Sequence, residues 1–406
     1  MRVLLVAGKG GVGKTTLAAA TALAAARDGH RTLLVSTDPA HSVLDVLGMT
    51  GAAGARVADW GAAGRPVPVP DAPGDLDVLQ IDTRARLDTA WTTLRATVGA
   101  LLGDVGVDPL VADEIAAVPG VDDVLALLEV AHHAQDYDAL VVDCAPTAET
   151  LRLLALPEAF DRLVARGLPL DRRIARLVGP LGLAPAAVDA LDALDRLAAD
   201  LVAVRTLVTG PGTAVRLVTT PERVVLAETQ RARTTLALLG HHVDGVVVNR
   251  VATGDHWPEP LTQRHRDVLV ATRDLFPELP VRWAPYSDAE PVGAAALLAL
   301  ADVVLGTSDP LDLDAPRAHV APVTDGRRWF LDVPVPGAGA DEVVLALTDD
   351  GDLVVDLGPH RRVVALPAVL RRCDVSGAHV DLTDAGSVLR VTFEPDLARW
   401  SSGAAG

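Results

Sequence analysis

A glycine-rich segment near the start of the chain constrains the fold more than any other feature. Residues 8–15 read G-K-G-G-V-G-K-T, which fits the pattern G-x-x-x-x-G-K-[ST]. The segment follows an all-apolar run, Val3–Val6, of the kind found in strands that are buried on both faces. It precedes Thr15–Asp28, a stretch of good helix formers that ends before a glycine. With a second apolar run at 32–36, this order predicts a β-loop-α-β unit.

The same segment has the chemistry of a phosphate-binding loop. Glycines let successive backbone N–H groups turn toward phosphate oxygens without a Cβ clash, and the N-terminus of the next helix adds partial positive charge. Lys14 can reach the β- and γ-phosphates, and the Thr15 hydroxyl can hold Mg²⁺. The predicted nucleotide-binding residues of this loop are Gly10, Gly11, Val12, Gly13, Lys14 and Thr15.

Lysine usage points to the same loop. The chain has 36 lysines and arginines together, and only Lys9 and Lys14 among them are lysines. Such a preference for arginine leaves lysine where an ammonium, a compact point charge, does what a planar guanidinium cannot. We therefore predict a functional role for both lysines.

Other apolar runs end in polar residues of interest. Ala139–Val142 leads into Asp143, Gly245–Val248 leads into Asn249, and another run lies at 216–220. These strands alternate with helical segments, which predicts an α/β fold with a doubly wound, mainly parallel sheet. An aspartate at the carboxyl end of a strand beside a phosphate loop can hold Mg²⁺ or its water ligands.

The chain divides into three predicted segments. Residues 1–305 form the nucleotide-binding domain, in which 84–133 and 150–208 have apolar residues at helical spacing and predict a helical subdomain. Residues 306–325 are rich in proline and aspartate and predict a linker. Residues 326–396 have strand patterns and predict a small all-β sandwich. Its expected strands are 329–333, 343–347, 353–357, 362–366 and 389–393, with a hairpin turn at Asp350-Gly351.

Composition excludes several classes of function. The formal net charge of −18 argues against a duplex nucleic-acid partner and against docking on anionic lipid by bulk charge. Two cysteines, Cys144 and Cys373, cannot build a disulfide framework or a four-thiolate zinc site. No apolar stretch approaches the roughly 20 residues of a membrane-spanning helix. We expect a soluble, cytoplasmic protein.

The loop with an additional lysine, Lys9, resembles the deviant phosphate loop of the arsenite-pump, partitioning and nitrogenase-iron-protein group of ATPases. In that group the additional lysine reaches across a homodimer to the partner's phosphates. The resemblance implies a homodimer that encloses ATP, with Lys9 and Lys14 as catalytic residues.

Two segments that follow strands narrow the resemblance. Residues 38–42 read D-P-A-H-S and residues 143–152 read D-C-A-P-T-A-E-T-L-R, similar to the two switches of the ArsA and tail-anchored-protein-targeting ATPases. The resemblance implies that Asp38 is catalytic and positions or activates the attacking water. It implies that Asp143 contributes to the Mg²⁺ site, through water, together with Thr15. Thr16 would contact the α-phosphate.

Three later motifs extend the resemblance over about residues 1–305. They are T-T-P-E at 219–222, V-V-N-R at 247–250 and E-P-V-G at 290–293. Asn249 would recognise adenine, since an amide offers both a donor and an acceptor. The last segment, 326–396, resembles the small-heat-shock (α-crystallin-like) domain of some bacterial ArsA-like ATPases.

The chain also departs from the pattern of these families. It lacks the cysteine cluster that binds arsenite and the Cys-x-x-Cys zinc clasp of the targeting ATPases, so no zinc is expected. It has two methionines, Met1 and Met49, and therefore no Met-rich groove for apolar clients. Ala148-Glu149 stands where the second switch usually has Gly-His.

The expected function is Mg²⁺-dependent ATP hydrolysis by a homodimeric switch. We expect it to be coupled to transport or membrane-protein targeting, with an unidentified client or membrane partner. One alternative is a chaperone or targeting factor that binds apolar segments. Another is an assembly scaffold that hydrolyses its nucleotide slowly. A partitioning ATPase on DNA is disfavoured by the acidic balance and by the predicted helical insert.

Overall fold

The structure is a computed structural model of the 406-residue chain. Contacts divide it into two units, Met1–Ala214 with Ser287–Leu313 and Val215–Tyr286 with Asp314–Gly406. Most of the predicted helical subdomain (84–133 and 150–208) lies outside the described residues, as does Asp38. The structure describes residues 1–37, 42–49, 65–81, 128, 130–144, 199, 202–204, 206–313, 321–325, 328–348, 351–358, 360–383 and 386–396.

The first unit is built on parallel strands. Its strand order is β3-β4-β2-β5-β1, followed by β6, which begins in this unit and ends in the second. The pairings β2–β4, β2–β5 and β1–β5 are parallel, and the short β3 pairs antiparallel with β4. The bounds are β1 Arg2–Gly8, β2 Thr32–Ser36, β3 Val67–Pro68, β4 Leu76–Gln80, β5 Ala139–Asp143 and β6 Thr213–Thr219.

Strand register brings the C-terminal ends of β1, β2 and β5 side by side. Asp143, the last residue of β5, lies opposite Val6 of β1 and opposite Ser36, the last residue of β2. The residues that precede these ends are apolar and almost fully buried, and each such side chain contributes about 1.5–3 kcal/mol on burial. A well-packed core therefore fixes the positions of Ser36 and Asp143 at the C-terminal edge of the sheet.

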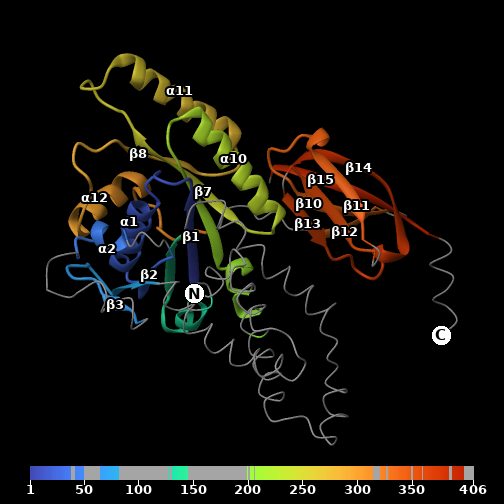
Figure 1. The fold of residues 1–406 in the computed structure, drawn as a ribbon, viewed down its shortest axis with the longest axis horizontal. Coiled ribbons are helices and arrows are strands. Elements are labelled where there is room, and N and C mark those ends of the chain that lie inside the picture. Colours follow the sequence, from blue (N-terminus) through green and yellow to red (C-terminus); the bar gives the residue numbers. More distant parts are fainter. Residues whose placement is uncertain are drawn as a thin grey trace, which may run out of the picture. The chain divides into compact units, whose positions relative to one another are not determined.

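Helix α1 (Lys14–Arg27) covers these strands and packs against α12 (Ala294–Leu305), as Figure 1 shows. Alanines make up much of α1 and are buried, so the helix can lie close to its neighbours. At Gly74 a Cβ would lie 2.1 Å from the carbonyl oxygen of Ala26, so only glycine fits there. The first unit also contains the short α2 (Ser42–Val46) and the 3₁₀ turn η1 (Ala134–Asp136).

The second unit continues with parallel strands and two long helices. The order is β6-β7-β8, with β7 at Val243–Val251 and β8 at Val281–Pro285. Helix α10 spans Arg223–Leu238, and α11 spans Glu259–Leu275. A buried ion pair connects β6 to the start of β7, with Arg216 Nε 3.1 Å from Asp244 Oδ2.

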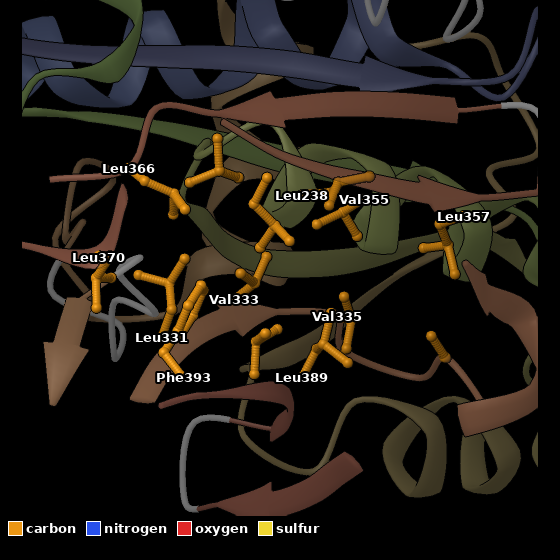
Figure 2. Packing of buried hydrophobic residues seen from close by; sticks show 14 of the residues in the cluster. Leu238, Leu331, Val333, Val335, Val355, Leu357, Leu366, Leu370, Leu389 and Phe393 are labelled. Carbon is orange, nitrogen blue, oxygen red and sulfur yellow. The ribbon is translucent and has the colours of Figure 1, made fainter. Parts of the chain in front are cut away.

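The end of the chain forms two antiparallel sheets in the second unit. One has the order β14-β15-β10-β9 and the other β11-β12-β13. A buried apolar cluster contains side chains from both sheets (Figure 2). The elements are β9 Ala321–Asp325, β10 Arg328–Pro334, η3 Ala340–Glu342, β11 Val343–Leu347, β12 Leu353–Leu357, β13 His360–Val364, η4 Leu370–Arg372, β14 Cys373–Thr383 and β15 Gly386–Pro395.

Helix α10 contributes to this C-terminal cluster. Leu238, the last residue of α10, is fully buried among Val333, Val355 and their neighbours (Figure 2). The Thr234 hydroxyl donates to the carbonyl oxygen of Pro336 at 2.6 Å. The Arg362 guanidinium donates to the carbonyl oxygen of Leu238, and a cation there complements the negative end of the helix dipole.

The predicted fold class is confirmed: a large, mainly parallel sheet with helices and a C-terminal antiparallel β region. Strands β9 and β14 were not among the predicted ones, and β13 begins two residues before the predicted 362–366. Its first residues, His360 and Arg361, carry polar side chains because β13 is an edge strand. Within the described residues, no helix combines the length and apolar character needed to cross a bilayer.

Candidate functional site

The glycine-rich loop connects the end of β1 to the start of α1. Gly11 and Gly13 have positive φ angles of 79° and 94°, a conformation that side chains with a Cβ adopt only with strain. Gly13 is the N-cap of α1, and its carbonyl oxygen accepts the N–H of Leu17 at 3.1 Å. A Cβ added at Gly10 or Gly11 would meet no atom within 4 Å, so the loop leaves open space beside its backbone.

The two lysines have different environments in this loop. Lys14 is 6 % exposed, and its ammonium donates to the carbonyl oxygen of Lys9 at 3.2 Å. The Lys14 side chain therefore folds back along the loop, and its positive charge lies beside the loop's backbone. Lys9 is exposed at the mouth of the loop.

Thr15 and Asp143 meet beside the loop. The Thr15 hydroxyl donates to Oδ2 of Asp143 at 2.8 Å, although the residues are 128 positions apart. Ser36 at the end of β2 donates to the same oxygen at 3.2 Å. Asp143 is completely buried, so these hydroxyls stabilise a charge that burial alone would disfavour.

Two hydroxyl residues of this cluster had no assigned role in the sequence reasoning. Ser36 contacts the Asp143 carboxylate, and Ser42 Oγ lies 3.3 Å from Thr15 Oγ1. Both serines belong to the segment that contains the first switch motif. Nothing in the amino-acid sequence distinguishes a functional serine there from a turn residue. The signal that could have found Ser36 is the register of β2 against β5.

The donor atoms of this cluster fit a hard divalent cation. Thr15 and Ser42 offer hydroxyl oxygens and Asp143 a carboxylate, and oxygen ligands of this kind suit Mg²⁺. Among the described residues no group of three or more histidine, cysteine and acidic side chains could hold a metal by itself. A cation here would need additional oxygen ligands such as phosphates and water, which is how Mg²⁺ is held in nucleotide sites.

The second unit holds the predicted base-recognition residue. Asn249 is 8 % exposed near the end of β7, and its Oδ1 accepts the N–H of Arg250 at 2.9 Å. Arg250 has a positive φ of 60°, which this side-chain bond supports. An amide side chain carries both a donor and an acceptor, and this bond uses the acceptor of Asn249.

His265 accepts a hydrogen bond from the backbone just after the end of β7. The N–H of Ala252 donates to Nδ1 of His265 at 2.9 Å, which requires the unprotonated form at that nitrogen. Burial lowers the pKa of His265, the nearby Glu222 carboxylate opposes that shift, and Arg264 adds to it. Two aromatic residues also follow strands of this unit, Trp257 after β7 and Tyr286 after β8. Their rings lie edge to face, with centroids 5.1 Å apart.

The structure thus brings together Lys9 and Lys14, and Thr15 and Asp143, while it places Asn249 in the second unit. Thr16 is the third residue of α1. Asp38, which carries the predicted role in activating water, lies outside the described residues, as do Pro146 and Thr147 of the second switch.

A glycine loop between a buried strand and a helix, with a threonine and a strand-end aspartate in contact beside it, places the chain in the P-loop class of folds. The sequence profile of the anion-transporting ATPases matches residues 1–306. The chain belongs to this ArsA ATPase family. A second profile, the HSP20-like domain found in ArsA, matches residues 326–393.

Curated relatives match most of the chain. Protein Rv2184c of Mycobacterium tuberculosis is 35 % identical over 98 % of this chain and 97 % of its own length. A Prosthecochloris vibrioformis protein, named provisionally as an arsenical pump-driving ATPase, is 30 % identical over 91 % of each chain. ATPase GET3B of Arabidopsis thaliana is 28 % identical over 74 % of this chain and 78 % of its own length.

Proposed function

We propose that this protein hydrolyses ATP with Mg²⁺ and that the hydrolysis cycle opens and closes a homodimer. The observation that carries the proposal is the contact of 2.8 Å between Thr15 and the buried carboxylate of Asp143 beside the glycine loop. This pairing joins a phosphate loop to a strand-end carboxylate, the combination that holds a nucleotide and its cation. Membership of the ArsA ATPase family supports the same activity.

The residues of the first unit have distinct proposed roles. Backbone N–H groups of Gly10–Gly13 and the ammonium of Lys14 bind the phosphates, and Thr16 contacts the α-phosphate. Thr15 holds the cation, with Asp143 acting through a water molecule. Bound Mg²⁺ neutralises phosphate charge during transfer of the terminal phosphoryl group. Asp38 orients the attacking water and accepts its proton.

Two residues have proposed roles outside this cluster. Asn249 recognises the adenine base through its amide. Lys9 is exposed at the mouth of the loop, and its proposed role is to contact the phosphates held by a second copy of the chain. Two closely apposed nucleotides concentrate negative charge, and a cation from each copy offsets the cost of burying it.

We further propose that the dimer cycle acts on a membrane protein, by driving transport or by targeting a client. Transport is supported by the name of one relative, which is placed with the arsenical pump-driving ATPases. Targeting is supported by the resemblance of the two switch motifs to those of the tail-anchored-protein-targeting ATPases. The chain has two cysteines, both buried, so a soft metalloid would have to be bound differently here from the way a thiolate cluster binds it. A metalloid-independent role is therefore favoured.

The test separates binding from hydrolysis. We expect the wild-type protein to release phosphate from ATP only when Mg²⁺ is present, and Asp38→Asn to bind ATP without releasing phosphate. Lys14→Ala is expected to lose both, because it removes the buried ammonium of the phosphate loop. Phosphate release and equilibrium ATP binding, with and without a chelator, measure these outcomes. Undiminished turnover in Lys14→Ala would contradict the assignment of the loop.

A further inference from the structure

Ser42 occupies a fixed position beside the phosphate loop. It is the first residue of α2, and the next two residues, Val43 and Leu44, are buried with 0 and 2 % exposure. The other end of α2 is also held, since the carbonyl oxygen of Val46 accepts the N–H of Gly293 at 2.9 Å. Core packing and this hydrogen bond therefore set the place of Ser42 Oγ.

The hydrogen bonds of Thr15 determine what its hydroxyl presents to Ser42. A hydroxyl has one proton and two lone pairs. The Thr15 proton goes to Oδ2 of Asp143, which at 2.8 Å is the shorter of its two contacts. The Thr15 oxygen therefore presents lone pairs, and no proton, toward Ser42. A metal cation binds to such lone pairs.

The distance between the two hydroxyls suits shared ligands. Thr15 Oγ1 and Ser42 Oγ are 3.3 Å apart, which is long for an O–H···O hydrogen bond. Neighbouring oxygens around an octahedral Mg²⁺ are about 3.0 Å apart, given metal–oxygen distances of about 2.1 Å. A shift of a few tenths of an ångström brings both oxygens to one cation.

We propose that Ser42 is a second hydroxyl ligand of the nucleotide's divalent cation, beside Thr15. The inference rests on the proposed Mg²⁺-dependent ATP binding and adds a ligand to it. It connects the cation directly to α2, whose first residue, Ser42, is the last residue of the predicted first switch motif. Ser36 has a different part, because its hydroxyl contacts the Asp143 carboxylate rather than Thr15.

Exchange of the ligand atom tests the proposal. Ser42→Cys replaces a hard oxygen with a soft sulfur, so a direct ligand shifts the metal preference from Mg²⁺ toward Cd²⁺. We expect the affinity for Mg²⁺ in the presence of ADP to fall at least about tenfold. The ratio of Cd²⁺ to Mg²⁺ affinity should rise by about tenfold or more. Ser42→Ala should lose Mg²⁺ affinity without the gain for Cd²⁺.

Ser36→Cys is the matched control, since it places sulfur on a residue that touches the carboxylate. Its metal preference should stay that of the wild-type protein. Cys144 and Cys373 are present in every variant, so any Cd²⁺ they bind cancels in the comparison. Competition of each metal with Mn²⁺, followed by electron paramagnetic resonance, measures affinity without relying on turnover.

The outcomes separate this inference from the function on which it rests. If the wild-type protein binds ADP with Mg²⁺ and Ser42→Cys has unchanged Mg²⁺ affinity and metal preference, Ser42 is not a ligand. If the wild-type protein binds no nucleotide with Mg²⁺, the proposed function itself is wrong. A shift of preference in Ser42→Cys alone supports the direct ligand.

Discussion

At the scale of single residues, Asp143 organises the candidate site. Its carboxylate is fully buried, yet it receives hydroxyl donors from α1 and from the end of β2. The proximity of Thr15 and Asp143 could be predicted, because a spaced motif and a strand-end aspartate are recognisable in the sequence. The contacts of Ser36 and Ser42 could not, because they depend on strand register and on how α2 packs.

A second residue-scale feature, His265, makes stability depend on pH. Burial lowers the pKa of His265 below its ordinary value near 6.5, so the unfolded chain binds the proton more tightly than the folded one. The stabilising contribution is therefore present above about pH 6.5 and is lost as the pH falls. His265→Asn keeps an acceptor for the N–H of Ala252 but does not titrate.

We expect the wild-type protein to lose more unfolding free energy than His265→Asn between pH 7.5 and pH 5.5. Urea unfolding at the two pH values measures the difference. His360, whose pKa burial also lowers, is present in both proteins and does not affect the comparison. Equal losses in the two proteins would show that His265 does not carry this pH dependence.

At the scale of elements, helix α10 shows a packing contact that could not be predicted from the sequence. Its apolar residues are recognisable from sequence as a buried face, but the pattern does not say what covers them. In the structure Leu238 is covered by the C-terminal sheets, and Arg362 of β13 binds the last carbonyl oxygen of α10. Strands with strong apolar patterns were predictable, whereas β9 and β14 carry glycine, proline or many polar residues.

The burial of Leu238 leads to a prediction about stability. Leu238→Ala removes a fully buried side chain and leaves a cavity, so we expect a loss of about 2–5 kcal/mol in unfolding free energy. Val224→Ala is the control on the same helix, because Val224 is 69 % exposed and its truncation should cost little. Denaturant unfolding of both variants checks this. A loss no larger in Leu238→Ala than in Val224→Ala would show that the C-terminal sheets do not hold α10.

At the scale of the whole molecule, the division in space differs from the division in sequence. The family profiles match 1–306 and 326–393, whereas contacts group 215–286 with 314–406. Composition could not show this, because the proline- and aspartate-rich stretch near 306–325 has the pattern of a linker whatever the domain after it contacts. The C-terminal domain is thus built together with α10.

The proposed function requires a second copy of the chain. Lys14 is folded back along its own loop, whereas Lys9 is exposed at the loop's mouth. Closing two copies around ATP without a cation from each side would bury phosphate charge at a cost of several kcal/mol. We therefore expect Lys9→Ala to keep ATP binding by each monomer but to lose ATP-induced dimerisation and most turnover. Lys9→Arg should be poorly tolerated because a guanidinium is wider than an ammonium.

The most direct measurement is sedimentation of the Asp38→Asn protein with ATP and Mg²⁺, alone and combined with Lys9→Ala. Asp38→Asn stops the cycle after binding, so the closed state accumulates. We expect an ATP-dependent dimer for Asp38→Asn and a monomer that still binds ATP for the double variant. An ATP-dependent dimer of undiminished affinity in the double variant would contradict the proposed reach of Lys9 to its partner. No dimer in either protein would contradict the homodimeric switch itself.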